Sequence, residues 1–122
     1  TPVQIQKLFF LLDRNISESI GGPIFNFQPY NYGPFDRAVY DVLEQLASEG
    51  SVSLETQNNW RTYKLTVQGQ TEGETILRNL PKQTQAYIES VSGFVRSLSF
   101  TQLVQAIYKA YPEMKQNSVF QE

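Results

Sequence analysis

The chain has 122 residues, a formal net charge of −2, 40% hydrophobic residues and 13% aromatic residues. This length and composition predict a single globular domain with its own core and argue against disorder. The sequence contains neither cysteine nor histidine, which excludes disulfides, thiolate chemistry, the commonest general base and the commonest metal ligand. Its apolar runs are too short for a membrane span or a signal-peptide core, so a cytoplasmic protein is the default expectation.

A first helix is expected at the N-terminus, where Thr1, Pro2 and Gln4 form a capping pattern. Its buried stripe recurs at helical spacing and consists of Ile5, Leu8, Phe9 and Leu12, widened by Phe10 and Leu11. Lys7 is expected on the solvent side of this helix. The run Gly21-Gly22-Pro23 must end any helix that precedes it.

An aromatic and proline-rich segment, FNFQPYNYGPFDRAVY, spans residues 25–40. It could be a platform that stacks bases or grips a peptide, or a packed connector that sets the angle of the next helix. Packing is favoured because most aromatic residues are buried. Tyr30 and Tyr32 are the least certain to be buried, because each hydroxyl needs water or a partner.

A second helix is predicted after Asp36, which is a typical N-cap residue, and it should end before Gly50. Phe35 and Tyr40 occupy the two positions of a hydrophobic staple across the cap. The inner face of this helix is expected to consist of Val39, Val42, Leu43, Leu46 and Ala47.

The middle of the chain predicts a β-hairpin followed by a third helix. Residues 51–55 and 60–66 alternate between apolar and polar side chains, which is typical of paired strands. The helix should extend over residues 67–80, up to Pro81.

The last third is helical by pattern and contains two apolar stripes. Ser99 and Gln102 form a capping box between them. We expect a helical hairpin over residues 81–112, followed by a tail over residues 113–122 that is either loose or docked through its few apolar residues.

The element order helix, turn, helix, glycine, hairpin, helix is that of a winged helix–turn–helix. Residues 39–52 resemble the end of a winged-helix recognition helix, and residues 63–69 resemble the Leu-Thr-x-x-Gly that follows the wing in many bacterial regulators. We therefore predict an α+β, mostly helical fold with a two-stranded wing. One domain, residues 1–122, would comprise a winged-helix core (1–80), the helical hairpin (81–112) and the tail (113–122).

A closer resemblance combines Lys7-Leu-Phe-Phe-Leu-Leu12 with Tyr32-Gly-Pro-Phe35. A Lys-Leu-rich first helix and a Tyr-Gly-Pro turn before the next helix resemble the Panacea-type (SocA-like) antitoxin domain and its bacterial relatives. The resemblance covers about residues 3 to 55. It implies a prokaryotic or phage origin and a role in toxin neutralisation or regulated protein contact, and it brings no catalytic residue with it.

The charges of the proposed winged helix argue against DNA as the main partner. Residues 36–49 carry four acidic side chains and one arginine, a net −3, which phosphates in a major groove would repel. The hairpin has Arg61 and Lys64 against Glu55, and these cations are few unless a dimer doubles them.

The leading hypothesis is a non-enzymatic regulatory protein, antitoxin-like or adaptor-like, that acts through protein contact. The alternative is a dimeric DNA-binding transcriptional regulator, and a subunit of a larger defence or phage assembly is a third hypothesis. No catalytic, metal or cofactor residue is assigned. The candidate partner-binding residues are Asp41 and Glu44, which share a helical face, and Trp60, because tryptophan is enriched at interface hot spots. The candidate DNA-contacting residues are Arg37, Arg61 and Lys64.

Overall fold

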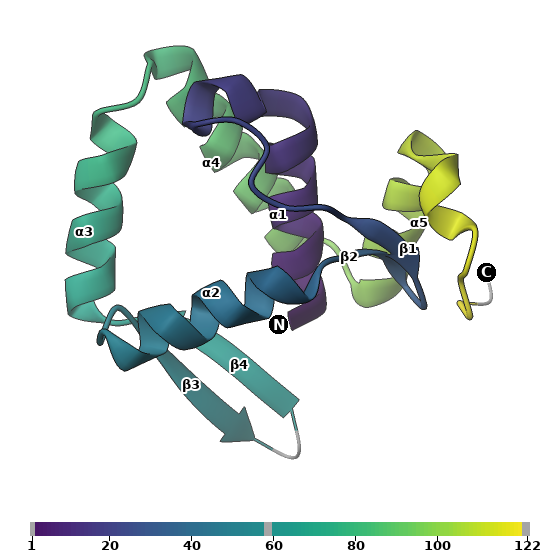
Figure 1. Ribbon diagram of the computed structural model, residues 1–122, viewed down its shortest axis with the longest axis horizontal. Helices are drawn as coiled ribbons and strands as arrows, with labels where there is room; N and C mark the ends of the chain where they lie inside the picture. Colours follow the sequence, from purple (N-terminus) through teal and green to yellow (C-terminus); the bar gives the residue numbers. More distant parts are fainter. Residues whose placement is uncertain (1, 58–59, 121–122) are drawn as a thin grey trace.

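The computed structural model describes residues 2–57 and 60–120. In this part of the chain the fold is α+β and 64% helical, with five α-helices and two antiparallel two-stranded sheets, as the mostly helical prediction expected (Figure 1). In chain order the elements are α1 (Pro2–Ile16), η1 (Ser17–Ile20), β1 (Gln28–Tyr30), β2 (Gly33–Phe35), α2 (Arg37–Ser48), β3 (Val52–Gln57), β4 (Trp60–Leu65), α3 (Val67–Arg78), α4 (Lys82–Ser97), α5 (Phe100–Ala110) and η2 (Pro112–Lys115).

Helix α1 is central, because α4, α5 and β2 all pack against it (Figure 1). The buried core cluster joins it to both C-terminal helices and to η2 through Phe10, Val95, Leu103, Val104, Ile107, Tyr108 and Met114. The predicted capping box is present at the start of α5. Ser99 Oγ accepts from Gln102 N at 3.2 Å, and Ser99 N donates to Gln102 Oε1 at 3.0 Å.

The buried side of α1 differs from the predicted stripe. Phe10, Gln6 and Lys7 are 1%, 1% and 3% exposed, whereas the predicted stripe is only partly buried outside Phe10. The prediction that Lys7 faces solvent is therefore wrong. The reason is that α1 is covered on more than one side, by α4 and α5 and also by the segment that contains β2.

The aromatic segment is a packed connector that contains a small hairpin, which the sequence did not predict. Strands β1 and β2 pair antiparallel with Tyr30 opposite Gly33. Two phenylalanines of the segment contact α1, since Phe25 stacks on Phe9 at 5.9 Å and Phe27 meets Phe10 edge-on at 5.5 Å between ring centroids. Tyr30 and Tyr32 remain 52% and 41% exposed, in line with the doubt about their burial.

Helix α2 begins as predicted. The side chain of Asp36 accepts from Ala38 N at 2.8 Å, and the staple rings of Phe35 and Tyr40 lie 5.7 Å apart. The side chain of Gln6 on α1 holds this cap in place, because it donates to Asp36 O and accepts from Asp36 N, each at 3.0 Å. Two oppositely directed bonds from one amide therefore fix where α2 starts relative to α1.

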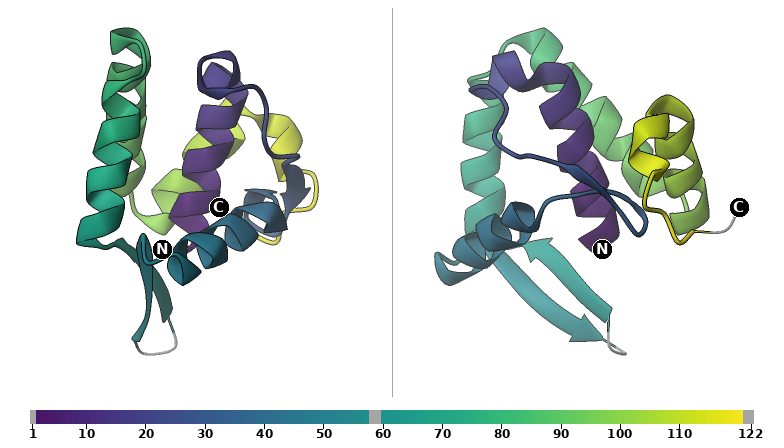
Figure 2. Two further views of the ribbon diagram at one scale, coloured as in Figure 1. Left: turned by 60° about the vertical axis from the view of Figure 1, so that its left-hand side comes forward. Right: turned by 45° about the vertical axis from the view of Figure 1, so that its right-hand side comes forward.

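The β3–β4 hairpin and α3 form a lightly packed arm. Strands β3 and β4 pair antiparallel, as predicted, with Val52 opposite Leu65. Helix α3 meets the rest of the chain mainly at its start, where Gly69 lies so close to the Ser51 carbonyl that a Cβ would stand 1.8 Å from that oxygen. The left view of Figure 2 shows the ribbon of α3 apart from that of α1. Gly69 is the one buried residue of this helix.

The tail docks onto the β1–β2 hairpin. Val119 N donates to Asn31 O at 2.9 Å, and Tyr108 Oη donates to Ser118 Oγ at 2.6 Å. The ring of Phe120 lies between those of Phe100 and Tyr108, at 5.9 and 6.4 Å. The docked alternative is therefore correct for the part of the tail that the structure describes.

Within residues 2–57 and 60–120, no helix has the length and apolar character needed to cross a bilayer.

Candidate functional site

The predicted partner-binding residues lie on two elements. Asp41 and Glu44 are both exposed on α2, as expected. Trp60 begins β4, and its side chain lies outside the described part of the structure. The structure therefore leaves an acidic, solvent-facing pair on α2, and whether Trp60 belongs with that pair stays a prediction.

The predicted DNA-contacting residues are also divided between elements. Arg37 is the first residue of α2, whereas Arg61 and Lys64 are exposed on β4. Lys64 Nζ lies 3.1 Å from Glu55 Oε2 on the neighbouring strand. One of the two wing cations is thus matched by an acid of the same hairpin, which reduces its value for phosphate contact.

An apolar hollow of about 250 Å³ opens between α1, η1, the following loop and α2. We call it the apolar hollow, and its lining residues are Phe9, Leu12, Asp13, Ile20, Ile24, Phe25 and Val42. The prediction that Val42 lies on the inner face of α2 is wrong, because this side chain is 37% exposed. Val39 and Leu43, predicted on the same face, are 0% and 5% exposed. Ile24 is 62% exposed. The hollow is therefore a place where apolar side chains meet solvent.

Asp13 is the one charged lining residue of the apolar hollow, and its carboxylate is already in use. Its Oδ1 accepts from Ile24 N at 2.9 Å, and its Oδ2 accepts from Phe25 N at 3.4 Å. These bonds fasten the loop to α1 and hold Ile24 and Phe25 at the wall of the hollow. The carboxylate is therefore occupied by backbone N–H groups, and the other lining residues of the hollow are apolar.

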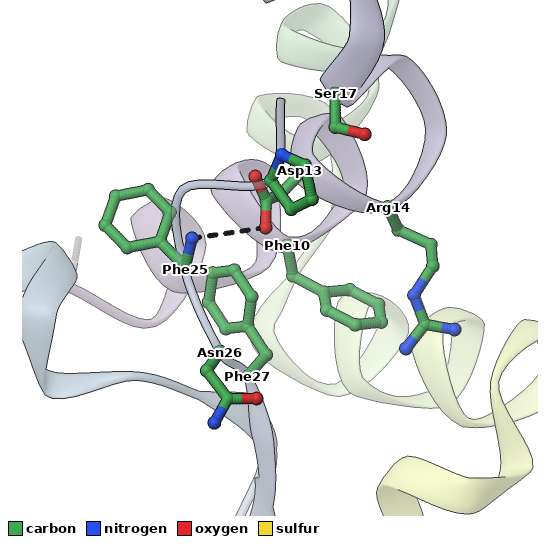
Figure 3. A pocket seen from close by; sticks show the side chains of 8 residues that line it. Phe10, Asp13, Arg14, Ser17, Phe25, Asn26 and Phe27 are labelled. Carbon is green, nitrogen blue, oxygen red and sulfur yellow. Dashed lines mark hydrogen bonds between the residues drawn. The ribbon is translucent and has the colours of Figure 1, made fainter. Parts of the chain in front are cut away.

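A second hollow, about 340 Å³, is lined by α1 and by the same loop (Figure 3). Arg14 is its cation, and Figure 3 shows this side chain beside Phe10. The guanidinium lies 5.0 Å from the Phe10 ring centroid and 5.2 Å from that of Tyr111, and Nη1 bonds to Glu113 Oε1 at 3.3 Å. Because Arg14 already contacts Glu113, Phe10 and Tyr111, packing within the protein accounts for this hollow without a ligand.

A third hollow, about 200 Å³, surrounds the end of the Lys7 side chain. We call it the lysine pocket, and its lining residues are Val3, Gln6, Lys7, Tyr30, Asn31, Tyr32, Gly33, Phe35 and Tyr40. A Cβ on Gly33 would lie 3.8 Å from Lys7 Nζ and 3.4 Å from Tyr108 Cε1, and its φ of +105° also favours glycine. The two sequence segments that resemble one family, the first-helix lysine and the Tyr-Gly-Pro turn, therefore meet in space.

Electrostatics in the lysine pocket are dominated by burial. Burial lowers the pKa of Lys7 to about 8, from the ordinary lysine value of 10.5. Burial is also the main cause that raises the pKa of Tyr40, and its hydrogen bond with Gln6 opposes that shift. Sequence reasoning missed both the lysine pocket and the apolar hollow. The lysine within the apolar first helix was the available signal for the former.

In the described ranges, no three or more His, Cys, Asp and Glu side chains gather where a metal ion could be held.

Comparison with known proteins gives one match. No curated protein and no solved structure is similar enough to match the chain. A family model described as "Antitoxin SocA-like, Panacea domain" matches residues 5–112, and so extends well beyond the segments in which the resemblance was first recognised. All residues that line the apolar hollow, and all that line the lysine pocket except Val3, lie within this range. The chain belongs to the SocA-like Panacea antitoxin domain family.

Proposed function

We propose that this protein is a non-enzymatic regulator that neutralises or controls a protein partner by direct contact. Membership of an antitoxin-like family supports a regulatory role. The observation that carries the proposal is the apolar hollow, where Ile24 and Val42 remain 62% and 37% exposed. An apolar patch that solvent reaches is typical of a protein interaction surface.

The expected chemistry of the partner follows from the charge on α2, the helix that contributes Val42 to the apolar hollow. Asp41 precedes Val42 on α2, and Glu44 lies one helical turn further along the same exposed face as Asp41. A partner that occupies the hollow and extends across α2 would meet this acidic face. Basic residues flanking an apolar anchor are therefore the expected complement.

The winged-helix interpretation belongs to this proposal. The order α1, α2, β3, β4, α3 supports it, and so does the two-stranded hairpin after α2. The segment between α1 and α2 contains η1 and the β1–β2 hairpin in the place where a middle helix would stand. A winged helix adapted for protein contact accounts for this difference together with the acidic α2, since fold alone does not fix function.

A growth assay tests the proposal. The gene next to this one would be expressed in a bacterial host alone and together with the full chain. We expect the neighbouring product to inhibit growth and the wild-type chain to relieve the inhibition. Val42→Asp should abolish this protection, because it places a charge in the apolar hollow.

Val67→Asp is the matched control. Val67 is 84% exposed at the start of α3 and does not line the apolar hollow, so this variant should protect as well as the wild type. Equal protection by Val42→Asp would show that the hollow is not the contact surface. Absence of protection by the wild-type chain against a toxic neighbour would contradict the proposed role itself.

A further inference from the structure

Lys7 is a buried cation without a partner in the described part of the chain. It is 3% exposed, less than any other lysine or arginine described there. None of the hydrogen bonds, ion pairs or cation–π contacts found among residues 2–57 and 60–120 involves its Nζ. A buried ammonium normally has an acid or several oxygens around it. Among the described residues, no fully buried side-chain nitrogen or oxygen lacks a hydrogen-bond partner, so the Lys7 ammonium keeps contact with solvent, and it does so at the lysine pocket.

The walls of the lysine pocket are aromatic and rigid. Tyr30 stacks on Phe35 with 5.0 Å between ring centroids, and Phe35 meets Tyr40 edge-on at 5.7 Å. Tyr32 also lines the pocket, and its ring meets that of Phe100 edge-on at 5.2 Å between centroids. The rings offer an apolar surface, and the hydroxyls of Tyr30 and Tyr32 can donate hydrogen bonds.

Charge balance selects the class of ligand. One largely buried ammonium is neutralised by one negative charge, and a dianion would leave an excess charge in the pocket. The described lining of the pocket contains no arginine, the residue that binds phosphate in a bidentate manner. A monoanionic carboxylate with an apolar body fits both the charge and the aromatic walls. The volume of about 200 Å³ suits a side chain or a small acid.

We propose that the lysine pocket binds the carboxylate of a ligand, with Lys7 Nζ as its charge partner and the tyrosine and phenylalanine rings of β1, β2 and α2 around its apolar body. The carboxylate comes either from a small organic acid or from an acidic side chain of another protein. This site shares no lining residue with the apolar hollow. The inference therefore does not rest on the proposed function.

Two-dimensional NMR of the full chain tests the proposal, with benzoate as the small acid and a blocked glutamate peptide as the protein-borne acid. Benzyl alcohol is the neutral control, and inorganic phosphate tests the choice of carboxylate. We expect benzoate or the peptide to shift the Lys7 side-chain resonances and to raise the Lys7 pKa, because an adjacent anion favours the ammonium. Benzyl alcohol should leave the Lys7 pKa where it is.

Matched variants locate the site. Lys7→Met keeps the length of the side chain and removes its charge, and it should weaken carboxylate binding at least about tenfold. Lys109→Met makes the same change at an exposed lysine of α5 and should bind like the wild type. The preferred probe identifies the source of the carboxylate, small acid or protein side chain.

Any of the following outcomes would overturn the inference. The first is equal carboxylate affinity in the wild type and Lys7→Met. The second is tighter binding of phosphate than of either carboxylate. The third is an unchanged Lys7 pKa at saturating probe, or no binding of either carboxylate up to about 10 mM. The pKa measurement uses the wild-type chain alone, so it decides the matter even if a variant folds poorly.

Discussion

The apolar hollow leaves Ile24 and Val42 62% and 37% exposed, whereas the lysine pocket holds Lys7 at 3% exposure. Both sites lie along α1, and each reverses the usual placement of its residue type. In the apolar hollow, apolar side chains stay in contact with water, whereas in the lysine pocket a charged side chain is largely removed from water. Residues that oppose the general rule in this way are expected where function, rather than folding, determines the residue.

The two reversals differ in cost. An aliphatic side chain that stays partly in solvent loses about 25 cal/mol of stabilising free energy for each Å² that remains exposed. It causes no further destabilisation. The lowered pKa of Lys7, about 8 against 10.5, corresponds to roughly 3 kcal/mol at about 1.4 kcal/mol per pKa unit. The lysine pocket is therefore the more expensive of the two sites for stability, and substitutions there should have the larger effect.

Lys7→Met gives the largest expected effect. The substitution removes the buried charge and keeps a flexible apolar chain of similar length, so the free energy of unfolding at pH 7 should rise by roughly 2–3 kcal/mol. Urea denaturation followed by circular dichroism measures it. Lys109→Met, at an exposed position, should change the free energy of unfolding by less than about 0.5 kcal/mol. A destabilised Lys7→Met would mean that the ammonium has a stabilising partner.

The buried charge of Lys7 should also make the free energy of unfolding depend on pH. Because the folded pKa of Lys7 lies below its unfolded value, the unfolded state binds more protons between the two, and the wild type should gain stability as pH rises above about 8. The pKa values of Tyr40 and Tyr87 are raised by burial, so their contribution opposes this gain above about pH 10. The useful window is therefore about pH 8 to 10.

Within that window, the wild type should gain up to about 2–3 kcal/mol, and Lys7→Met should show no such rise. Denaturant midpoints at half-unit steps of pH measure both proteins. The titratable side chains that line the pocket with Lys7 are Tyr30, Tyr32 and Tyr40, and Tyr108 on α5 lies beside Lys7 at Gly33. The same rise in both proteins would assign the effect to groups other than Lys7.

Asp13→Ala tests whether the Asp13 carboxylate holds the loop that lines the apolar hollow. Its effect on the free energy of unfolding should be smaller than that of Lys7→Met. Loss of the bonds to Ile24 N and Phe25 N should lower the free energy of unfolding by about 1–2 kcal/mol. Amide hydrogen exchange at Ile24 and Phe25 should accelerate, because the loop loses its attachment to α1. Asp41→Ala, at an exposed site on α2, is the control. Unchanged exchange at both amides would show that the ring contacts alone hold the loop.

Local features of the fold followed from the sequence, because they depend on neighbours in the chain. The Asp36 cap, the β3–β4 hairpin and the Ser99 capping box are all of this kind. The burial of Lys7 and the exposure of Val42 depend instead on which distant elements surround α1 and α2. A helical pattern identifies an apolar stripe but does not indicate whether other sides of the helix are covered.

The candidate sites also divide into features that local sequence determines and features that depend on distant parts of the chain. Asp41 and Glu44 were predicted as an exposed pair, and their exposure follows from their positions on an amphipathic helix. The lysine pocket forms only because the β1–β2 hairpin folds back over α1 and brings Tyr32 and Gly33 to Lys7. Periodicity cannot supply that contact. In the sequence, the segment around Lys7 and the Tyr32-Gly-Pro turn were linked only by their shared resemblance to one family.

Val42→Asp should have the smallest effect on stability and so completes the comparison. Its side chain is already partly in solvent at the edge of the apolar hollow, and α2 keeps Val39 and Leu43 as its buried contacts. The free energy of unfolding should therefore fall by less than about 1 kcal/mol, measured by urea denaturation beside Val67→Asp. The same variant should lose partner contact in the growth assay, while Lys7→Met should retain it. A large loss of stability in Val42→Asp would show that the hollow is part of the core, and its exposed apolar residues would then no longer indicate a partner.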